Sequence, residues 1–254
     1  MTNNGVLFFS LFISILIFSS KCYSSQQRLI PTLNFGYSEF APYTYTNKNG
    51  LASGDVTDIV KKVVTSTDYK FIAVAGANRR LFRNMLADKI DILMVVPFKN
   101  ADSDKLIFGE NVSDILDLTV FWLQGEAPDI TEINQLQKKA LIAIAGYSYG
   151  GVFRENGPLK NTQHFLLETH PRALQALMLG RAPYLLAYMK PAMFYVEPER
   201  KQQLSSYVFG SIPLVLSIRR SYPNAEKVLN QLEKRYAELF PERFHTFNPS
   251  LPLN

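Results

Sequence analysis

The sequence predicts an α/β protein made of two halves, on three observations. Apolar stretches typical of buried strands alternate with stretches of helical spacing, which is the order expected for parallel sheets covered by helices. This alternation occurs once in the first half of the chain and begins again near Leu118. No Pro/Ser-rich linker separates the halves, so the 254 residues are expected to form two closely connected lobes.

Strands and helices alternate in the first half. The strands are expected at residues 29–37, 70–74 and 90–96, and the last is a nearly continuous apolar run, as in a parallel strand covered on both faces. The helices are marked by apolar side chains at helical spacing, which are Val56, Ile59, Val60, Val63 and Val64 in the first and Leu81, Phe82, Met85 and Leu86 in the second. The order β-α-β-α-β predicts a parallel sheet.

The second half repeats the pattern. Strands are expected at residues 118–123, 141–145, 183–188 and 212–218. A helix over residues 170–179 is expected to stop at Gly180. Pro223 and Asn224 open a long amphipathic helix, whose inward side chains are Val228, Leu229, Leu232, Tyr236 and Leu239. Ligands of parallel sheets lie beyond the carboxyl ends of strands, which here are near Tyr37, Pro97, Gly146 and Tyr188.

The N-terminus predicts export. Residues 6–18 are an unbroken run of apolar residues and serines, shorter than the roughly 20 residues that span a bilayer. Small residues follow, and cleavage after Ser24 makes residues 1–24 a signal peptide and the protein periplasmic. The alternatives are a buried strand or an uncleaved anchor. Lys21 precedes the sole cysteine, Cys22, where a lipoprotein site needs a small residue.

Charge and motifs argue against several function classes. The net charge of +5 is modest and the basic residues are scattered, whereas a nucleic-acid footprint is denser and one-sided. No His or Cys pairs have the spacing of metal ligands, and no glycine-rich nucleotide loop of the GxxxxGK type is present. No nucleic acid, metal or cofactor is therefore expected.

Four stretches resemble the bacterial extracellular solute-binding proteins of the amino-acid type, family 3. The opening Gly-Tyr-Ser-Glu-Phe-Ala-Pro-Tyr of residues 36–43, followed by Asn49, Gly50, Gly54 and Asp58, is similar to the opening of that family. Three later stretches follow in the order that the family has. Residues 86–92 contain Lys-Ile-Asp, as in the family's signature after a short helix. Residues 141–149 resemble the family's strand and glycine loop, and residues 176–181 resemble its helix end at Gly-Arg.

The resemblance implies the type II periplasmic-binding-protein fold, in which two α/β lobes are joined by a two-strand hinge and close on a ligand. The crossing strands are expected near residues 119–124 and 210–214. Residues 25–120 and 211–254 would then form lobe 1, and residues 121–210 would form lobe 2. The implied function is capture of a small polar solute, amino-acid-like or an organic anion. The implied partner of the monomeric protein is an ABC permease or a membrane sensor.

Two charged groups of the family's amino-acid site are missing. Family members that bind free amino acids carry an Arg about ten residues after the Ile-Asp pair, whose guanidinium clamps the ligand carboxylate; residues 99–104 here are Lys-Asn-Ala-Asp-Ser-Asp. They also carry an Asp after the Gly-Arg helix end, in a register that falls on or near Tyr188. A zwitterion would need other partners here, because a buried unpaired charge is costly.

Phe40, Tyr43, Arg80 and Lys99 are the site candidates of lobe 1. The family uses an aromatic residue after the first strand as a ligand platform, which favours Phe40 and leaves Tyr43 open. Arg79 and Arg80 begin a helix where the family places a pocket residue. One of them would bind an anion and the other would be solvated; the alternation does not distinguish them, and Arg80 is taken as the candidate. Lys99 follows a strand end and would replace the missing Arg as a point charge, although a solvated lysine is the commoner case.

The candidates of lobe 2 are Tyr147, Ser148, Tyr149 and Tyr188. The first three occupy a glycine-flanked loop whose N–H groups and serine hydroxyl suit an anion. Residues 146–150 also match the Gly-x-Ser-x-Gly pattern of hydrolases, but His164 and His170 follow too soon for that layout. Tyr188 would face the site if the register holds, and a core tyrosine is equally consistent with the pattern.

Two further functions stay open. An enzyme on the same scaffold, similar to cyclohexadienyl dehydratase, needs a carboxylate or imidazole in the site, and Glu39 and Glu155 are the acids near the expected loops. A ligand-less interaction module would explain the loss of both zwitterion partners. The leading expectation is a binding protein with no catalytic residue.

Overall fold

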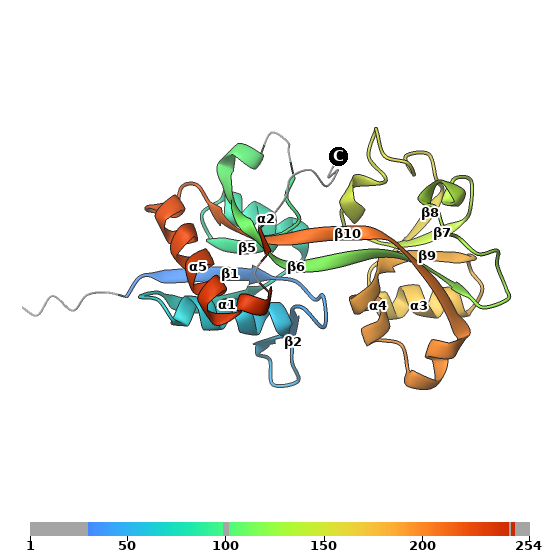
Figure 1. Ribbon diagram of the computed structural model, residues 1–254, viewed down its shortest axis with the longest axis horizontal. Coiled ribbons are helices and arrows are strands. Elements are labelled where there is room, and N and C mark those ends of the chain that lie inside the picture. Colours follow the sequence, from blue (N-terminus) through green and yellow to red (C-terminus); the bar gives the residue numbers. More distant parts are fainter. Residues whose placement is uncertain (1–29, 99–101, 244, 247–254) are drawn as a thin grey trace, which may run out of the picture.

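The computed structural model describes residues 30–98, 102–243 and 245–246. Two lobes lie side by side, and two long strands run from one to the other (Figure 1). The predicted signal peptide of residues 1–24 and the candidate Lys99 lie outside the described residues.

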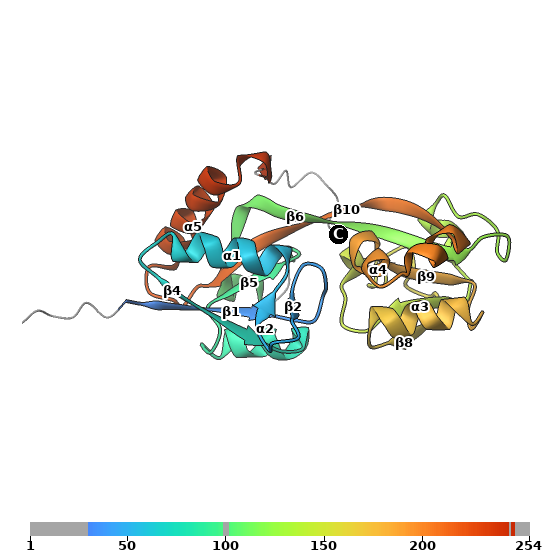
Figure 2. The same ribbon diagram turned by 90° about the horizontal axis from the view of Figure 1, so that it is seen from below.

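Lobe 1 is a parallel three-layer unit. Its strands are β1 (Thr32–Tyr37), β4 (Lys70–Ala75) and β5 (Ile92–Val95), which pair in parallel in the order β4-β1-β5. Its helices are α1 (Asp55–Thr65), α2 (Asn78–Leu86) and α5 (Ala225–Leu239), and β2 (Tyr45–Thr46) pairs with β3 (Ala52–Ser53). Figure 2 shows α1 on one side of the sheet and α2 on the other. The predicted β-α-β-α-β order is confirmed.

The joining strands are β6 (Leu106–Leu123) and β10 (Leu204–Arg219). They pair antiparallel from Leu106 opposite Arg219 to Leu123 opposite Leu204, with register shifts between Val208 and Gly210, between Leu214 and Val215 and between Val215 and Ser217. Both strands are much longer than the predicted segments 118–123 and 212–218, because each runs on across the boundary between the lobes.

Lobe 2 has a mixed arrangement. Its strands are β7 (Leu141–Ile144), β8 (His164–Leu167) and β9 (Tyr184–Tyr188), in the order β6-β9-β7-β8, with β9, β7 and β8 parallel to one another. Its helices are α3 (His170–Met178) and α4 (Met189–Phe194). The remaining short elements are 3-10 turns at Ser103–Lys105, Ile133–Leu136, Tyr149–Gly151, Pro198–Gln203 and Pro241–Arg243, and β11 (His245–Thr246), which pairs with β6.

A buried ion pair fixes the edge of lobe 1 where β1, β5 and β10 meet. The Asp91 side chain is 2 % exposed and accepts hydrogen bonds from the backbone N–H and the side-chain amide of Asn34, at 2.8 and 2.9 Å. The guanidinium of Arg219 donates to it from Nε at 2.9 Å and lies 2.8 Å away at Nη2. The carboxylate is thus both paired and hydrogen-bonded, as a buried charge must be.

All described strands except β2 and β3 belong to one sheet, because β6 and β10 contribute to both lobes. One hydrophobic cluster continues from Leu33 and Phe35 of lobe 1, through Leu116 and Val120 of β6, to Tyr184 of lobe 2. The two lobes therefore share a core along the joining strands. No helix in the described part of the chain is long and apolar enough to cross a bilayer. The two-lobed α/β architecture joined by two strands is confirmed.

Candidate functional site

A cavity of about 300 Å³, here called the interlobe cavity, lies between the two lobes. Its aromatic lining in lobe 1 consists of Phe35, Tyr37, Phe40, Tyr43, Phe82 and Phe98. Lobe 2 contributes Gly146, Tyr147, Ser148 and Tyr188. Its volume is at the lower end of the roughly 300–1,000 Å³ of small-molecule sites. Five of the eight predicted site residues, Phe40, Tyr43, Tyr147, Ser148 and Tyr188, line this cavity.

Phe40 contacts both lobes. It follows β1 in a tight turn, in which Phe40 and Thr44 exchange backbone hydrogen bonds at 2.7 and 3.2 Å. This turn stacks its ring on Tyr43 of the same lobe, with centroids 5.3 Å apart. Across the cavity the ring lies 5.1 Å from that of Tyr147 and 5.9 Å from that of Tyr188, both edge-on. These are preferred geometries for aromatic pairs, so Phe40 holds the lobes together as well as lining the cavity.

The loop after β7 is ordered by tyrosines. Gly146 has a φ of +83°, which turns the chain away from the sheet at a conformation that favours glycine. The Tyr149 hydroxyl is bonded to the backbone of Ile144, accepting from N–H at 2.5 Å and donating to C=O at 3.2 Å. The Tyr149 N–H donates to the Tyr188 hydroxyl at 3.1 Å. Tyr149 is 1 % exposed and does not line the cavity, so it supports the loop from below.

The tyrosines of the site are neutral. Burial raises the pKa of Tyr188 to about 12, although hydrogen bonds from Ser148 and Tyr149 oppose the rise. Burial likewise raises the pKa of Tyr147 and of Tyr43. Their hydroxyls are therefore uncharged donors and acceptors at physiological pH.

His170 belongs to the same aromatic cluster, although its sequence position pointed only to a helix start. It begins α3 and is 3 % exposed. Its ring lies 6.0 Å from Phe40, 5.5 Å from Tyr147 and 6.0 Å from Tyr195, and Nε2 is buried without a hydrogen-bond partner. Burial lowers the pKa of His170 to about 4, so the imidazole is neutral at pH 7.

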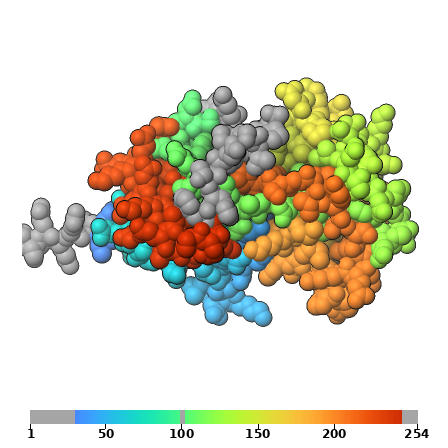
Figure 3. Space-filling view, viewed as in Figure 1, coloured from blue at the N-terminus to red at the C-terminus, as the bar shows by residue number. Residues whose placement is uncertain are grey.

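A second contact joins the lobes beside the cavity. Lys190 of α4 forms an ion pair with Asp55 at the start of α1, with Nζ and Oδ2 2.5 Å apart, and lies 4.7 Å from the ring centroid of Tyr43. The Tyr43 hydroxyl in turn donates to the carbonyl of Ile115 on β6, at 3.0 Å. Figure 3 shows the β2–β3 segment in light blue beside the orange α4 region of lobe 2, where the rings of Tyr45 and Phe194 lie 6.3 Å apart.

The other candidate residues lie away from the lining. Arg80 is exposed at the start of α2 and is not part of the lining, because the first turn of α2 presents Asn78 to the cavity instead. Glu39 is exposed and accepts hydrogen bonds from Thr46, and Glu155 is exposed and pairs with Lys160. The described residues contain no group of three His, Cys, Asp or Glu side chains suited to a metal ion.

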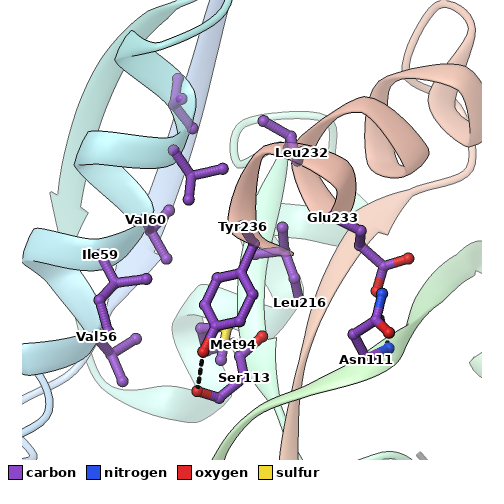
Figure 4. Close-up of a pocket in the computed structure, with 12 residues that line it drawn as sticks. Val56, Ile59, Val60, Met94, Asn111, Ser113, Leu216, Leu232, Glu233 and Tyr236 are labelled. Carbon is purple, nitrogen blue, oxygen red and sulfur yellow. Dashed lines mark hydrogen bonds between the residues drawn. The ribbon is translucent and has the colours of Figure 1, made fainter. Parts of the chain in front are cut away.

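A second cavity, between α1, α5 and the sheet, is too small for a solute. Its volume of about 20 Å³ is comparable to the space of one water molecule. Figure 4 shows apolar side chains such as Val60 and Leu232 facing it, with the Tyr236 hydroxyl bonded to the carbonyl of Ser113 at 2.7 Å. Of these two cavities, the interlobe cavity is the better candidate for a ligand site.

No protein-family model matches the chain, and no curated protein matches its sequence. Solved structures match its fold. A histidine kinase sensor domain similar to periplasmic binding proteins superposes with a TM-score of 0.70 at 16 % identity, over 84 % of this chain and 91 % of that one. Holo ArgBP from T. maritima gives a TM-score of 0.65 at 17 % identity, over 82 % of this chain and 90 % of that one. A histidine-bound substrate-binding protein of an ABC uptake transporter from Streptococcus pneumoniae gives 0.66 at 16 % identity, over 83 % and 87 %. The chain therefore has the two-lobed fold of the periplasmic solute-binding proteins.

Proposed function

We propose that this protein captures a small solute in the interlobe cavity, outside the cytoplasm, for delivery to an ABC permease or for detection by a membrane sensor. The observation that carries the proposal is the interlobe cavity itself, which has walls from both lobes and lies at the carboxyl ends of β1, β5, β7 and β9. Similar solved structures include both a sensor domain and an ABC substrate-binding protein, which supports either delivery route.

Binding is favoured over catalysis by the chemistry of the walls. General acid–base elimination needs a carboxylate or an imidazole within reach of the substrate. Among the described residues that line the cavity there is neither, and Glu39 and Glu155 lie elsewhere on the surface. The presence of a formed cavity with neutral polar groups likewise favours a ligand over a purely structural module.

The proposal also includes the lobe boundaries, a hinge at the joining strands and the residues that contact the solute. We assign residues 25–120 and 211–254 to lobe 1 and residues 121–210 to lobe 2, with closure about the joining strands. Phe40, Tyr43, Tyr147, Ser148 and Tyr188 are the proposed contact residues, and Tyr149 supports them. We further propose that the protein is a monomer and that residues 1–24 direct its export.

Thermal-shift screening of the purified protein with amino acids, small organic acids, amines and neutral ring compounds tests the proposal. A ligand that binds only the folded state raises Tm in a concentration-dependent manner. Phe40→Ala is expected to weaken binding of any hit at least tenfold. Phe165→Ala, at an exposed position on β8, is the matched control and is expected to leave binding unchanged. Absence of any shift across the whole panel would count against solute capture.

A further inference from the structure

The described residues that line the interlobe cavity carry no formal charge. Among the described residues, the lining consists of aliphatic and aromatic side chains, two glycines, and a few neutral polar groups, which are Ser38, Thr44, Asn78, Ser148 and the tyrosine hydroxyls. Tyr188, at the end of β9, lines the cavity with a hydroxyl that already accepts the N–H of Tyr149. An ammonium group placed there would find no carboxylate.

Two charged pairs close to the cavity are already formed. Lys190 is paired with Asp55, 2.5 Å away, and faces the ring of Tyr43. Asp91 is held by Arg219 at the opposite end of β5. A charged solute in the cavity would therefore give up its hydration without gaining an ion pair from the described walls, which is unfavourable.

The apolar surface of the cavity suits a ring. Rings of Phe40, Tyr147 and Tyr188 meet at one side, and Phe82 and Phe98, whose centroids are 5.5 Å apart, lie among the residues of the lobe 1 side. Aromatic pairs gain attraction beyond the area that they bury when stacked offset or edge-to-face. The neutral side chains of Asn78 and Ser148 offer hydrogen bonds to an amide or hydroxyl at the edge of such a ring.

We infer that the solute is an uncharged, ring-bearing small molecule with one or two neutral hydrogen-bonding groups, and not a zwitterionic amino acid. The inference rests on the proposed function and narrows it. The neutral tyrosines strengthen it, because burial raises the pKa of Tyr147 and Tyr188 and no deprotonated phenol is available to hold a cation.

A series of ligands on one ring tests the inference with the full chain. Benzamide, benzoate, benzylamine and L-phenylalanine share a phenyl group and differ in charge. Calorimetry and ligand-detected NMR are expected to show benzamide binding at least tenfold more tightly than the three charged compounds. The opposite order would overturn the inference and leave solute capture standing. If no compound of this series and no compound of a full amino-acid panel binds, the result would count against both the inference and solute capture.

A variant of the lining links the preference to the cavity. Asn78 is the first residue of α2, where a carboxylate is favoured by the helix dipole, so Asn78→Asp is expected to fold normally. The new charge should improve benzylamine binding at least tenfold and change benzamide binding less than threefold. Asn230→Asp, at an exposed position on α5 away from the cavity, adds the same charge and is the control for net charge. An unchanged order of affinities in Asn78→Asp would overturn the assignment to this cavity.

Discussion

His170 makes the stability of the protein depend on pH in a predictable direction. Its imidazole is buried among the rings of Phe40, Tyr147 and Tyr195, and burial lowers its pKa from 6.5 to about 4. Between these two values the unfolded chain binds a proton at this residue and the folded protein does not. Lowering the pH through this window therefore favours unfolding, and the loss is complete below about pH 4.

The magnitude follows from the pKa difference. At pH 5, about 1.5 units below the ordinary pKa of histidine, protonation of the unfolded chain costs about 2 kcal/mol of folding free energy relative to pH 7.5. His170→Phe removes the titration and keeps a ring in the cluster. It is expected to be about 2 kcal/mol more resistant to acid over this interval than the wild type.

Urea unfolding at pH 7.5 and pH 5 measures this difference. Asp114 and Glu233, whose pKa values are raised mainly by burial, act in the opposite direction, but they are present in both proteins and cancel in the comparison. Tyr195→Phe alters a neighbouring ring without removing the imidazole and should keep the wild-type pH dependence. Equal losses of stability in the wild type and His170→Phe would refute the reasoning.

Three further outcomes are expected. Asp91→Ala removes the buried carboxylate between Asn34 and Arg219 and leaves the guanidinium of Arg219 only its more exposed partner Asp88, so the free energy of unfolding should fall by about 3 kcal/mol in urea titrations. A loss below about 1 kcal/mol would contradict this. Lys190→Met removes the half-exposed interlobe ion pair, so the free energy of unfolding should fall by less than about 1 kcal/mol. Small-angle scattering should show a larger radius of gyration for this variant than for the control Lys201→Met. Equal radii would argue against a role of the ion pair in holding the lobes together. Tyr236→Phe removes a hydrogen bond to β6 and should cost about 1 kcal/mol, and an unchanged midpoint in urea would show that the bond contributes nothing.

Periodicity predicted lobe 1 well because each of its elements buries one clear face. The apolar spacing of α1 and the continuous run of β5 left little ambiguity, and both form as expected. The joining strands were harder to delimit, since Glu110, Asp114 and Asp117 interrupt the apolar pattern of β6 where one of its faces is open. Strand β8 was missed because the sheet edge leaves Phe165 half-exposed, without alternation of apolar and polar residues.

The residues of the site that come directly after a strand could be predicted from the sequence. Phe40 and Tyr147 come directly after β1 and β7, so the general rule for parallel sheets placed them correctly beside the cavity. Arg80 was predicted for the wall, but Asn78, two positions earlier in the first turn of α2, lines the cavity instead. His170 and Lys190 gave no signal, because their roles depend on contacts with lobe 1 that only the three-dimensional arrangement creates.

The pairing of β6 with β10 also limits how the two lobes can move relative to each other. A two-stranded ribbon has no freely rotating joint, so the lobes separate by bending and twisting a ladder whose alignment is fixed by its backbone hydrogen bonds. If the cavity opens and closes as proposed, its walls would part along a narrow range of paths. Phe40 would then return to the same tyrosines at each closure.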